Sequence, residues 1–345
     1  MRAITFHRFQ GPLTIEQLPD PTPPQHGVVI AVEATGLCRS DWHGWQGHDP
    51  DITAMPHVPG HELAGRIVAV GPEVRRWRRG ERVTTPFVCG CGTCTPCRRG
   101  DNQVCDHQTQ PGFTHWGSFA ELVAIHHADV NLVAVPDAID PVTAASLGCR
   151  FATAFRAVVD QGRVQPGHWV AIHGMGGVGL SALLIARAFG ARVAAVDIDP
   201  TTLNRARELG ADMVINGHED VVAAIHDVTQ GGADVSIDAL GSTTTATNSI
   251  RCLRKNGRHV QVGLLVGDDH RPALPMELVI AHELEIVGSH GMAAHAYPRM
   301  LQMITNGQLA PHDLIARTVG LADIPSELPL LASRSAGGMV VATTY

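Results

Sequence analysis

Four cysteines crowd into a short stretch of the chain and form the side-chain set best suited to hold a metal ion. They are Cys91, Cys94, Cys97 and Cys105. Four thiolates complete a tetrahedron around zinc and leave no open position, so the lobe at about residues 89–106 is predicted to hold a structural zinc. A cluster of free or redox-active thiols is the competing interpretation. Cys89 and Cys252 fall outside this spacing and are expected to be bystanders.

A second set of metal-ligating side chains is dispersed over three segments of the chain. Cys38 lies in the stretch GLCRSDWH, His61 in a G-H-E turn after a proline, and Cys149 in the stretch SLGC. Each is weak evidence alone, because a lone cysteine is usually a packing residue. Two thiolates and one imidazole together hold a zinc ion and leave its fourth position for water or substrate. The sequence therefore predicts an open, catalytic zinc site.

A glycine-rich turn joins a predicted apolar strand, Trp169–His173, to a predicted apolar helix, Leu180–Phe189. Its G-x-G-x-x-G pattern permits a tight turn, close approach of a pyrophosphate, and close helix–strand packing. The free amides at the start of the helix then attract the phosphates. A chance glycine-rich turn is disfavoured by this strand–turn–helix context. The residues expected to bind a dinucleotide here are Gly174, Gly176, Gly177, Val178 and Gly179.

An acidic residue ends the next predicted strand, at the separation from the glycine turn that dinucleotide-binding chains show. Asp197 can accept hydrogen bonds from ribose hydroxyls and would repel a 2′-phosphate. No arginine or lysine directly follows it, and Asp199 adds negative charge. The sequence therefore favours NAD over NADP.

Two patterns of elements position these residues. The first part of the chain, to about residue 150, is β-rich, with expected strands at Val28–Glu33, Leu63–Val70 and Leu122–Ile125. Beyond it, six apolar strands alternate with helix-length segments, which predicts a doubly wound parallel sheet in an α/β fold. These strands are Trp169–His173, Arg192–Asp197, Met213–Ile215, Val235–Ala239, His259–Val262 and Leu284–Gly288. The alternation stops after about Ser289, and the tail ends in a strand-like run, Met339–Thr343.

Length and charge narrow the class of protein. A chain of 345 residues exceeds the usual size of a single core, so two domains are expected. The net charge of −7 attracts neither nucleic acid nor an anionic membrane. With no basic-then-apolar leader and no long uncharged apolar run, the chain is expected to be cytoplasmic, where disulfides are rare. Four arginines around Trp77 are interpreted as a solvated turn rather than a nucleic-acid site.

With these motifs in this order, the chain resembles the zinc-containing medium-chain alcohol dehydrogenases over essentially its whole length. The resemblance implies a GroES-like catalytic domain, residues 1–150 and 289–345, with a Rossmann NAD-binding domain, residues 151–288, inserted into it. It implies that Cys38, His61 and Cys149 are the catalytic zinc ligands. Glu62 resembles the acid that can approach the metal during ligand exchange, and Asp41 the carboxylate that orients the zinc-bound imidazole.

Further residues match the family or depart from it. Arg39 resembles the residue that meets the cofactor phosphates, and Thr153 the threonine that packs near the nicotinamide. The family often has a basic residue near the C-terminal strand, where this chain reads Gly337-Gly338-Met339. Arg150 follows the third zinc ligand, where a small residue is frequent; it is expected either to alter the pocket or to form an ion pair.

The expected reaction is the reversible oxidation of a primary or secondary alcohol to an aldehyde or ketone. Zinc acts as a Lewis acid that eases loss of the hydroxyl proton, and NAD accepts the hydride. Ser40 can take up the proton, and His43, which titrates near neutrality, can release it to solvent. The resemblance implies that cofactor ribose hydroxyls bridge the two. The competing interpretation makes His43 an ordinary loop histidine.

Other functions compete with this one. A polyol or sugar dehydrogenase with similar zinc ligation stays open, whereas the second metal set argues against a zinc-free quinone or enone reductase. A zinc-and-nucleic-acid module would leave the glycine turn unexplained. The expected partners are a small alcohol, aldehyde or ketone and further copies of the chain, as a homotetramer or homodimer. Six apolar residues could line a pocket or lie in the core: Trp42, Trp45, Phe87, Trp116, Leu264 and Leu265.

Overall fold

The computed structural model describes residues 1–332 and 338–344, and the chain divides into two compact units. The first comprises Met1–Ala152, Gly291–Gly307 and Pro311–Tyr345, and the second comprises Thr153–His290 and Gln308–Ala310. The short run from Gln308 groups with the second unit, which the sequence pattern did not indicate. Gly337, the first residue of the stretch in which related proteins often have a basic residue, lies outside the described residues.

The second unit is built on a six-stranded, fully parallel sheet, as predicted. Its strands run in the order β10-β9-β8-β11-β12-β13. The chain order reverses between β8 and β11, and dinucleotides bind at such a switch point, beyond the carboxyl ends of the strands. The strands are β8 (Trp169–His173), β9 (Arg192–Asp197), β10 (Met213–Asn216), β11 (Ala233–Asp238), β12 (Leu253–Gln261) and β13 (Glu285–Gly288).

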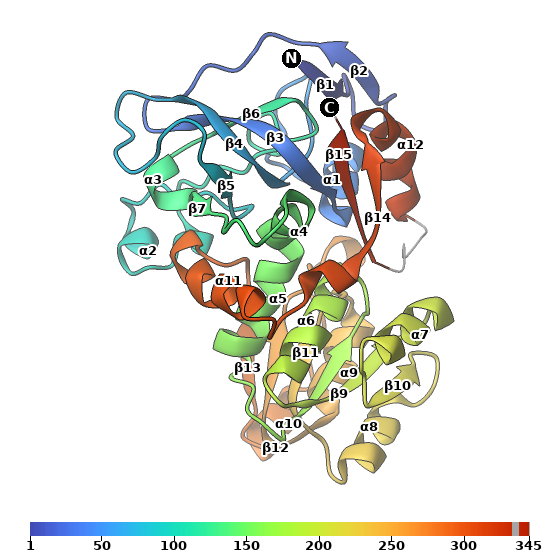
Figure 1. Ribbon diagram of the computed structural model, residues 1–345. Helices are drawn as coiled ribbons and strands as arrows, with labels where there is room; N and C mark the ends of the chain where they lie inside the picture. Colours follow the sequence, from blue (N-terminus) through green and yellow to red (C-terminus); the bar gives the residue numbers. More distant parts are fainter. Residues whose placement is uncertain (333–337, 345) are drawn as a thin grey trace. The chain divides into compact units, whose positions relative to one another are not determined.

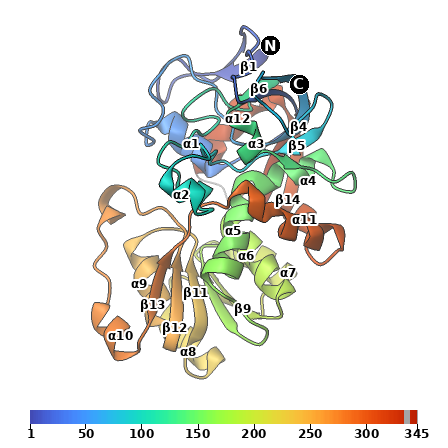
Figure 2. The same ribbon diagram turned by 90° about the vertical axis from the view of Figure 1, so that its left-hand side faces the viewer.

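Helices cover both faces of this sheet (Figure 2). Every residue of β8 is buried, as expected for a parallel strand covered on both sides. Three of these helices begin at a residue whose side chain caps them; the side chain of Ser242, for example, accepts the amide of Thr245 at the start of Thr243–Arg251. The helices are α6 (Gly177–Ala188), α7 (Pro200–Glu208), α8 (Val221–Thr229), α9 (Thr243–Arg251) and α10 (Met276–Ala281).

The first unit contains a seven-stranded sheet, mostly antiparallel, in the order β14-β15-β3-β4-β5-β7 with β6 paired to β3 (Figure 1). The C-terminal strand β15 pairs antiparallel with β3, so segments from before and after the second unit share one sheet. A separate hairpin joins β1 (Arg2–Thr5) to β2 (Thr14–Gln17). The sheet strands are β3 (Val28–Leu37), β4 (Glu62–Val70), β5 (Arg82–Thr84), β6 (Leu122–Ile125), β7 (Val133–Ala134), β14 (Ile315–Gly320) and β15 (Met339–Thr344).

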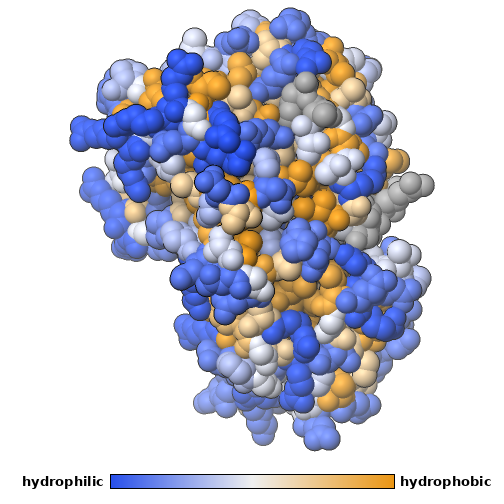
Figure 3. Space-filling model, viewed as in Figure 1, coloured by the Kyte–Doolittle hydropathy of each residue, from blue (hydrophilic) through white to orange (hydrophobic). Residues whose placement is uncertain are grey.

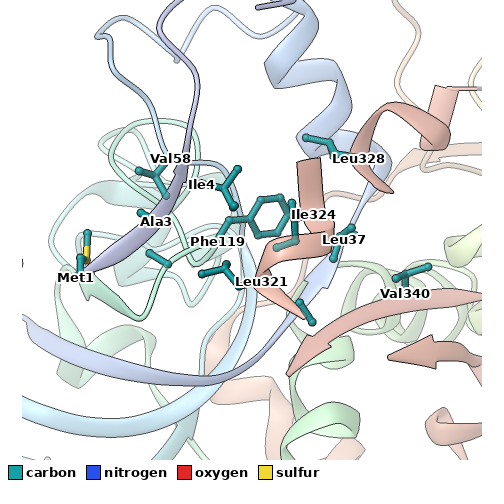
Figure 4. Close-up of a cluster of buried hydrophobic side chains, with 12 residues drawn as sticks. Met1, Ala3, Ile4, Leu37, Val58, Phe119, Leu321, Ile324, Leu328 and Val340 are labelled. Atoms are coloured by element: carbon teal, nitrogen blue, oxygen red, sulfur yellow. The ribbon is translucent and has the colours of Figure 1, made fainter. Parts of the chain in front are cut away.

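An apolar cluster in the first unit unites residues far apart in the sequence (Figure 4). Ile4, Phe119 and Ile324 are fully buried within it. Trp42, Trp45 and Trp116 pack against its margin, which favours a core role for Trp42 and Trp45; Trp116 also lines a cavity beside His57 and Phe113. Leu264 is instead exposed. The short helices of this unit include α1 (Arg39–Gln46), α2 (Thr95–Arg98), α3 (Ala128–Asn131), α4 (Pro141–Ser146), α11 (Tyr297–Thr305) and α12 (Ile324–Glu327).

One helical run of the described chain, Pro141–Gln161, is long and apolar enough to cross a membrane by length and composition. This run contains Arg150 and Arg156, and 78% of its 18-residue apolar stretch is buried inside the protein. Burial of this extent is typical of a core helix.

The arginine-rich loop between β4 and β5 is an ordered turn. Trp77 is buried, and its indole nitrogen donates to the Ala128 carbonyl at 3.0 Å. The amides of Arg75 and Arg76 donate to the carboxylate of Asp129. Figure 3 has the same view as Figure 1 and shows strongly hydrophilic side chains gathered over β4 and α3. A buried tryptophan offers no stacking surface to a nucleic acid, which favours the solvated turn.

Candidate active site

The structure brings the dispersed metal-ligating residues together within the first unit. Cys38, His61, Glu62 and Cys149 each offer one ligand atom, and these atoms all lie within 4.8 Å of one another. Cys38 follows β3 directly, and His61 and Glu62 stand at the start of β4, which pairs with β3. Sheet pairing therefore places three of the four side chains side by side.

Asp41 links the segments that carry two of these side chains. Its Oδ2 accepts the amide of Cys38 at 2.9 Å, in a capping box at the start of α1. Its Oδ1 accepts the amide of Gly60 at 3.0 Å and the Nδ1–H of His61 at 2.8 Å. A carboxylate that holds Nδ1–H leaves the lone pair of Nε2 free for a metal.

The Nε2 atom of His61 is buried and has no hydrogen-bond partner in the part of the chain that the structure describes. Buried polar atoms are rarely left unsatisfied, so this nitrogen calls for a ligand. A hydrogen bond between the thiols holds the pKa of Cys38 well below its usual range and that of Cys149 well above it. One thiolate is thus favoured already, and a bound dication would favour the second. The donor set fits an open zinc site.

Cys149 is positioned by a turn of π-helix, Leu147–Phe151, and such turns often occur at functional sites. The carbonyl of the preceding residue, Gly148, accepts the amide of Phe87 at 3.0 Å and the hydroxyl of Tyr297 at 3.3 Å. Tyr297 is fully buried and comes from α11, almost 150 positions further along the chain. No local pattern in the sequence pointed to it.

Glu62 is held by Arg150 rather than left free. Its Oε1 accepts the backbone amide and the Nε of Arg150, both at 3.0 Å, and its Oε2 accepts from a terminal guanidinium nitrogen. Both side chains are buried. Burial raises the pKa of the Glu62 carboxyl, and Arg150 opposes that shift. Of the two expectations for Arg150, the structure shows the ion pair.

Gly36 on β3 makes room for this pair. A Cβ atom at this position would overlap the Glu62 carboxylate and lie 3.2 Å from a guanidinium nitrogen of Arg150. The glycine of the G-x-C motif is therefore required by close approach of the ion pair.

Two aromatic rings border the imidazole of His61. The ring of Phe87 lies 6.3 Å from it and the ring of Phe113 lies 5.3 Å from it, centroid to centroid. Phe87 was one of the expected pocket candidates, whereas Phe113 was missed by the sequence analysis. Their apolar surfaces limit the access of water to this side of the cluster.

The four-cysteine lobe is compact and closed. Ligand atoms of Cys91, Cys94, Cys97 and Cys105 lie within 4.8 Å of one another. Backbone amides point at the sulfurs: those of Cys91 and His107 lie 3.2 Å from Cys105 Sγ. Burial raises the pKa of Cys91, but hydrogen bonds from Thr93, Cys94 and Cys105 together outweigh it and lower the pKa to about 5. All eight cysteines are free of disulfides. Four convergent sulfurs fit a structural zinc.

The residues expected to move a proton lie on α1. Ser40 Oγ lies 3.8 Å from Cys38 Sγ, which places this hydroxyl at the metal-ligand cluster. His43 is half-buried, and burial followed by the charges of Arg39 and His48 lowers its pKa. No direct hydrogen bond joins Ser40 to His43 among the described residues, so a relay between them needs a bridging group. Arg39 is exposed at the start of the helix.

In the second unit, the glycine turn has the geometry of a phosphate site. Gly174 has φ of 92°, and a Cβ at Gly179 would overlap the Gly174 carbonyl, so the turn is tight and the helix packs closely. A Cβ at Gly176 would meet nothing within 4 Å. The turn is therefore open at the second glycine, where a pyrophosphate needs to approach. Gly177 and Val178 begin α6.

Asp197 ends β9 beside this turn. Its Oδ2 accepts the amide of Met175 at 2.7 Å, and its Oδ1 accepts the amide of Asp199 at 3.0 Å. Each oxygen keeps a lone pair for a ribose hydroxyl. Asp199 caps α7 by accepting the amide of Thr201 at 2.8 Å. Thr153 is buried, and no partner of its Oγ1 is found within the described ranges.

Comparisons with known proteins agree with this arrangement. Residues 24–137 match the alcohol dehydrogenase GroES-like domain and residues 177–306 match the zinc-binding dehydrogenase family. The chain is 32% identical to an alcohol dehydrogenase of Geobacillus stearothermophilus, over 99% of this chain and 98% of that protein. It is 30% identical to a sorbitol dehydrogenase of Halalkalibacterium halodurans, over 91% and 90% of the two chains.

Solved structures extend the likeness to three dimensions. A crystal structure of an NAD-dependent alcohol dehydrogenase is similar with a TM-score of 0.89 and 29% identity, and it covers 100% of both chains. The matched families, the full-length relatives and the two metal-ligand sets lead to one conclusion: the chain belongs to the zinc-dependent medium-chain alcohol dehydrogenase family.

Proposed function

We propose that this protein catalyses the reversible oxidation of a primary or secondary alcohol to an aldehyde or ketone, with hydride transfer to NAD. The observation that carries the proposal is the open donor set of Cys38, His61 and Cys149, with the buried, unpartnered Nε2 of His61 among them. Reduction of NAD by a panel of primary, secondary and polyhydroxy alcohols, before and after zinc is removed by a chelator, tests it. Turnover that survives removal of all zinc would reject it.

The chain's own residues divide the work of the reaction. When bound, zinc would supply Lewis acidity and NAD would serve as the hydride acceptor. Cys38, His61 and Cys149 would hold the metal, and Asp41 keeps the imidazole in the required tautomer. The Ser40 hydroxyl, beside the ligand cluster, takes up the proton that the alcohol loses. His43 then carries it away from the site.

A polyol is the second candidate substrate, and the likeness to a sorbitol dehydrogenase favours it. Phe87 and Phe113 beside His61 favour a plain alcohol instead, since apolar rings offer no hydrogen bonds to additional hydroxyls. The same panel separates the two, because a polyol enzyme would prefer the polyhydroxy members.

Asp197 is expected to set the choice of cofactor. A hydrogen bond from a ribose hydroxyl of NAD to the charged Asp197 carboxylate contributes about 1.5–3 kcal/mol. The 2′-phosphate of NADP would remove this bond and repel the carboxylate. NAD should therefore be preferred at least roughly a hundredfold, at about 1.4 kcal/mol per tenfold. Asp197→Ser should weaken the binding of NAD and lower the ratio of kcat/KM for NAD to kcat/KM for NADP, without reversing the preference for NAD. Asp199→Asn keeps the helix cap and removes only the second negative charge, so the preference should change less than in Asp197→Ser. Equal efficiency with NADP in the unmutated enzyme would show that Asp197 does not face the ribose.

Two zinc ions per chain are expected, one in each donor set. Cys97→Ala should lose the structural ion and lower the thermal midpoint, because a closed four-thiolate site contributes folding free energy directly. Cys89→Ala is the matched control: Cys89 is not one of the four convergent sulfurs, and its thiol bonds instead to Thr85 and the Pro86 carbonyl, so two ions should remain. Elemental analysis and thermal unfolding measure both effects. An unchanged zinc content in Cys97→Ala would contradict the structural site.

We also propose a homodimer or homotetramer in the cytoplasm. The edge strand β13 exposes Ile286, and the adjacent α10 exposes Met276 and Ile280, the last by 79%. An apolar sheet edge favours pairing with another chain. Eight free thiols suit a reducing compartment. Sedimentation of the purified protein measures the assembly.

A further inference from the structure

The C-terminal end of α1 brings two histidines together. Gly47 follows the helix with φ of 83°; its amide donates to the Gly44 carbonyl, and the amide of His48 donates to the His43 carbonyl, both at 3.0 Å. These two bonds form a Schellman motif, which places the residue after the left-handed glycine against the side chain five positions earlier. That contact is usually apolar. Here both residues are histidine.

The two imidazoles are hydrogen-bonded to each other. His43 Nδ1 lies 3.0 Å from His48 Nδ1. Two ring nitrogens bond at this distance when one carries a hydrogen and the other a lone pair, so the pair shares one proton. Trp42 contacts both rings edge-on, at centroid distances of 4.8 Å from His43 and 5.8 Å from His48. The aromatic contacts hold the pair in place.

The pair spans the boundary between protein and water. His43 is half-buried, one helical turn from Ser40, whereas His48 is exposed. Burial, Arg39 and His48 lower the pKa of His43, and only Cys38 opposes them. The segment Leu328–Ala332, which packs against α1, has no charged side chain. A proton that arrives at His43 is therefore readily passed on.

Two acidic residues follow the histidine pair in the sequence, Asp49 and Asp51. Asp49 follows His48, and its Oδ1 accepts the amide of Asp51 at 2.9 Å. For a proton on Nδ1 of His43, His48 is the acceptor that the structure places within hydrogen-bond distance.

We propose that His48 is the terminal member of the proton relay: His43 passes the alcohol proton to His48, which releases it to water. This inference rests on the proposed alcohol dehydrogenase function. A proton binds to Nε2 of His43 as its Nδ1–H bond breaks and a new N–H bond forms on Nδ1 of His48. His48 then loses its Nε2 proton to water, so that one proton enters and one leaves, with no change of oxidation state. Exchange with water restores the tautomers, and carbonyl reduction runs the path in reverse.

His48→Gln tests the relay, because glutamine can accept a hydrogen bond but cannot carry the proton. In dilute, non-imidazole buffer, kcat for alcohol oxidation should fall about tenfold on the acid side of the profile, less than the ~10²–10⁴ typical of a direct general base. Added imidazole should restore much of the loss, and KM for NAD should not change. His43→Gln combined with His48→Gln should be no slower than His43→Gln alone. His312→Gln, at another exposed histidine, serves as the control and should retain the unmutated rate.

The outcomes separate the relay from a structural role. An unchanged pH–rate profile in His48→Gln, or a loss that imidazole does not rescue and that a lower thermal midpoint accompanies, would overturn the proposal. An unmutated protein that holds zinc but oxidises no alcohol would reject the proposed function instead.

The histidine pair itself can be tested without turnover. Acylation by diethyl pyrocarbonate, followed by peptide mass spectrometry across pH, reports the titration of His43. Because His48 lowers the pKa of His43, His48→Gln should raise it. An unchanged titration of His43 would overturn the pairing on which the relay depends.

Discussion

Cys149→Ala is expected to release one zinc ion from each chain and to lower alcohol turnover about a thousandfold. Lewis-acid assistance is worth several kcal/mol, and each ~1.4 kcal/mol is about tenfold in rate. The variant removes one of only two thiolates in the cluster, and Cys38 and His61 alone cannot complete an open tetrahedral site. Elemental analysis gives the zinc content, and steady-state kinetics with saturating NAD gives the turnover.

The fold should survive this change, because the backbone at residue 149 is held independently of its thiol. The Gly148 carbonyl accepts bonds from Phe87 and Tyr297, and Arg150 anchors the other side. Cys252→Ala is the matched control, since its buried thiol lies in the second unit, donates to the Ser249 carbonyl and belongs to neither metal-ligand set. It should keep both zinc ions and most of the activity. Full turnover in Cys149→Ala would remove the basis for a catalytic metal at this cluster.

Arg150→Ala is expected to lower the free energy of unfolding by about 3–5 kcal/mol, because it leaves the carboxylate of Glu62 buried without its charge partner. The exposed fraction of the Glu62 side chain is 0%, and Arg150 supplies three hydrogen bonds to it. The backbone amide bond would persist in the variant, but both guanidinium bonds would be lost. Denaturant unfolding of the zinc-loaded protein measures the effect.

A surface ion pair provides the matched control for this prediction. Arg317 pairs with Glu327 with its side chain 46% exposed, so Arg317→Ala should cost about 1 kcal/mol or less. Glu62→Gln combined with Arg150→Met removes both charges and should recover part of the stability that Arg150→Ala loses. Equal costs for Arg150→Ala and Arg317→Ala would mean that Glu62 is solvated or neutral in the folded protein.

The local parts of the fold could be predicted from the sequence, because they depend on neighbouring residues. The strands Trp169–His173, Arg192–Asp197 and Leu122–Ile125 have the predicted bounds. Gly167 and Gly174 flank the first of these strands, and Gly190 and Asp197 bound the second. Other strands were predicted too short: β12 begins at Leu253, six positions before the predicted start at His259. Arg254, Lys255 and Asn256 near its start are exposed and polar, so hydrophobicity gave no signal for them.

The parts of the site that sequence analysis missed depend on contacts between distant residues. Arg150 reaches Glu62 across 88 positions, and Tyr297 reaches Gly148 across 149. No local spacing encodes such pairs. For His48 a signal was present, because a histidine that follows a helix-ending glycine is placed against the helix by the Schellman motif. That signal becomes informative only once the helix end is known to be Gln46.

The pairing of β15 with β3 also constrains the order in which the protein can form during synthesis. Val340, Val341 and Ala342 lie beside Leu37, Gly36 and Thr35, immediately before Cys38. The strand that precedes the first metal ligand therefore lacks one neighbour until Met339–Thr344, about 300 positions further along the chain, has left the ribosome. The Rossmann unit is almost continuous in the chain and can fold earlier, because domains generally fold as units during translation. On this view the catalytic unit is completed last, so newly made chains would bind NAD before they hold a fully ordered zinc site.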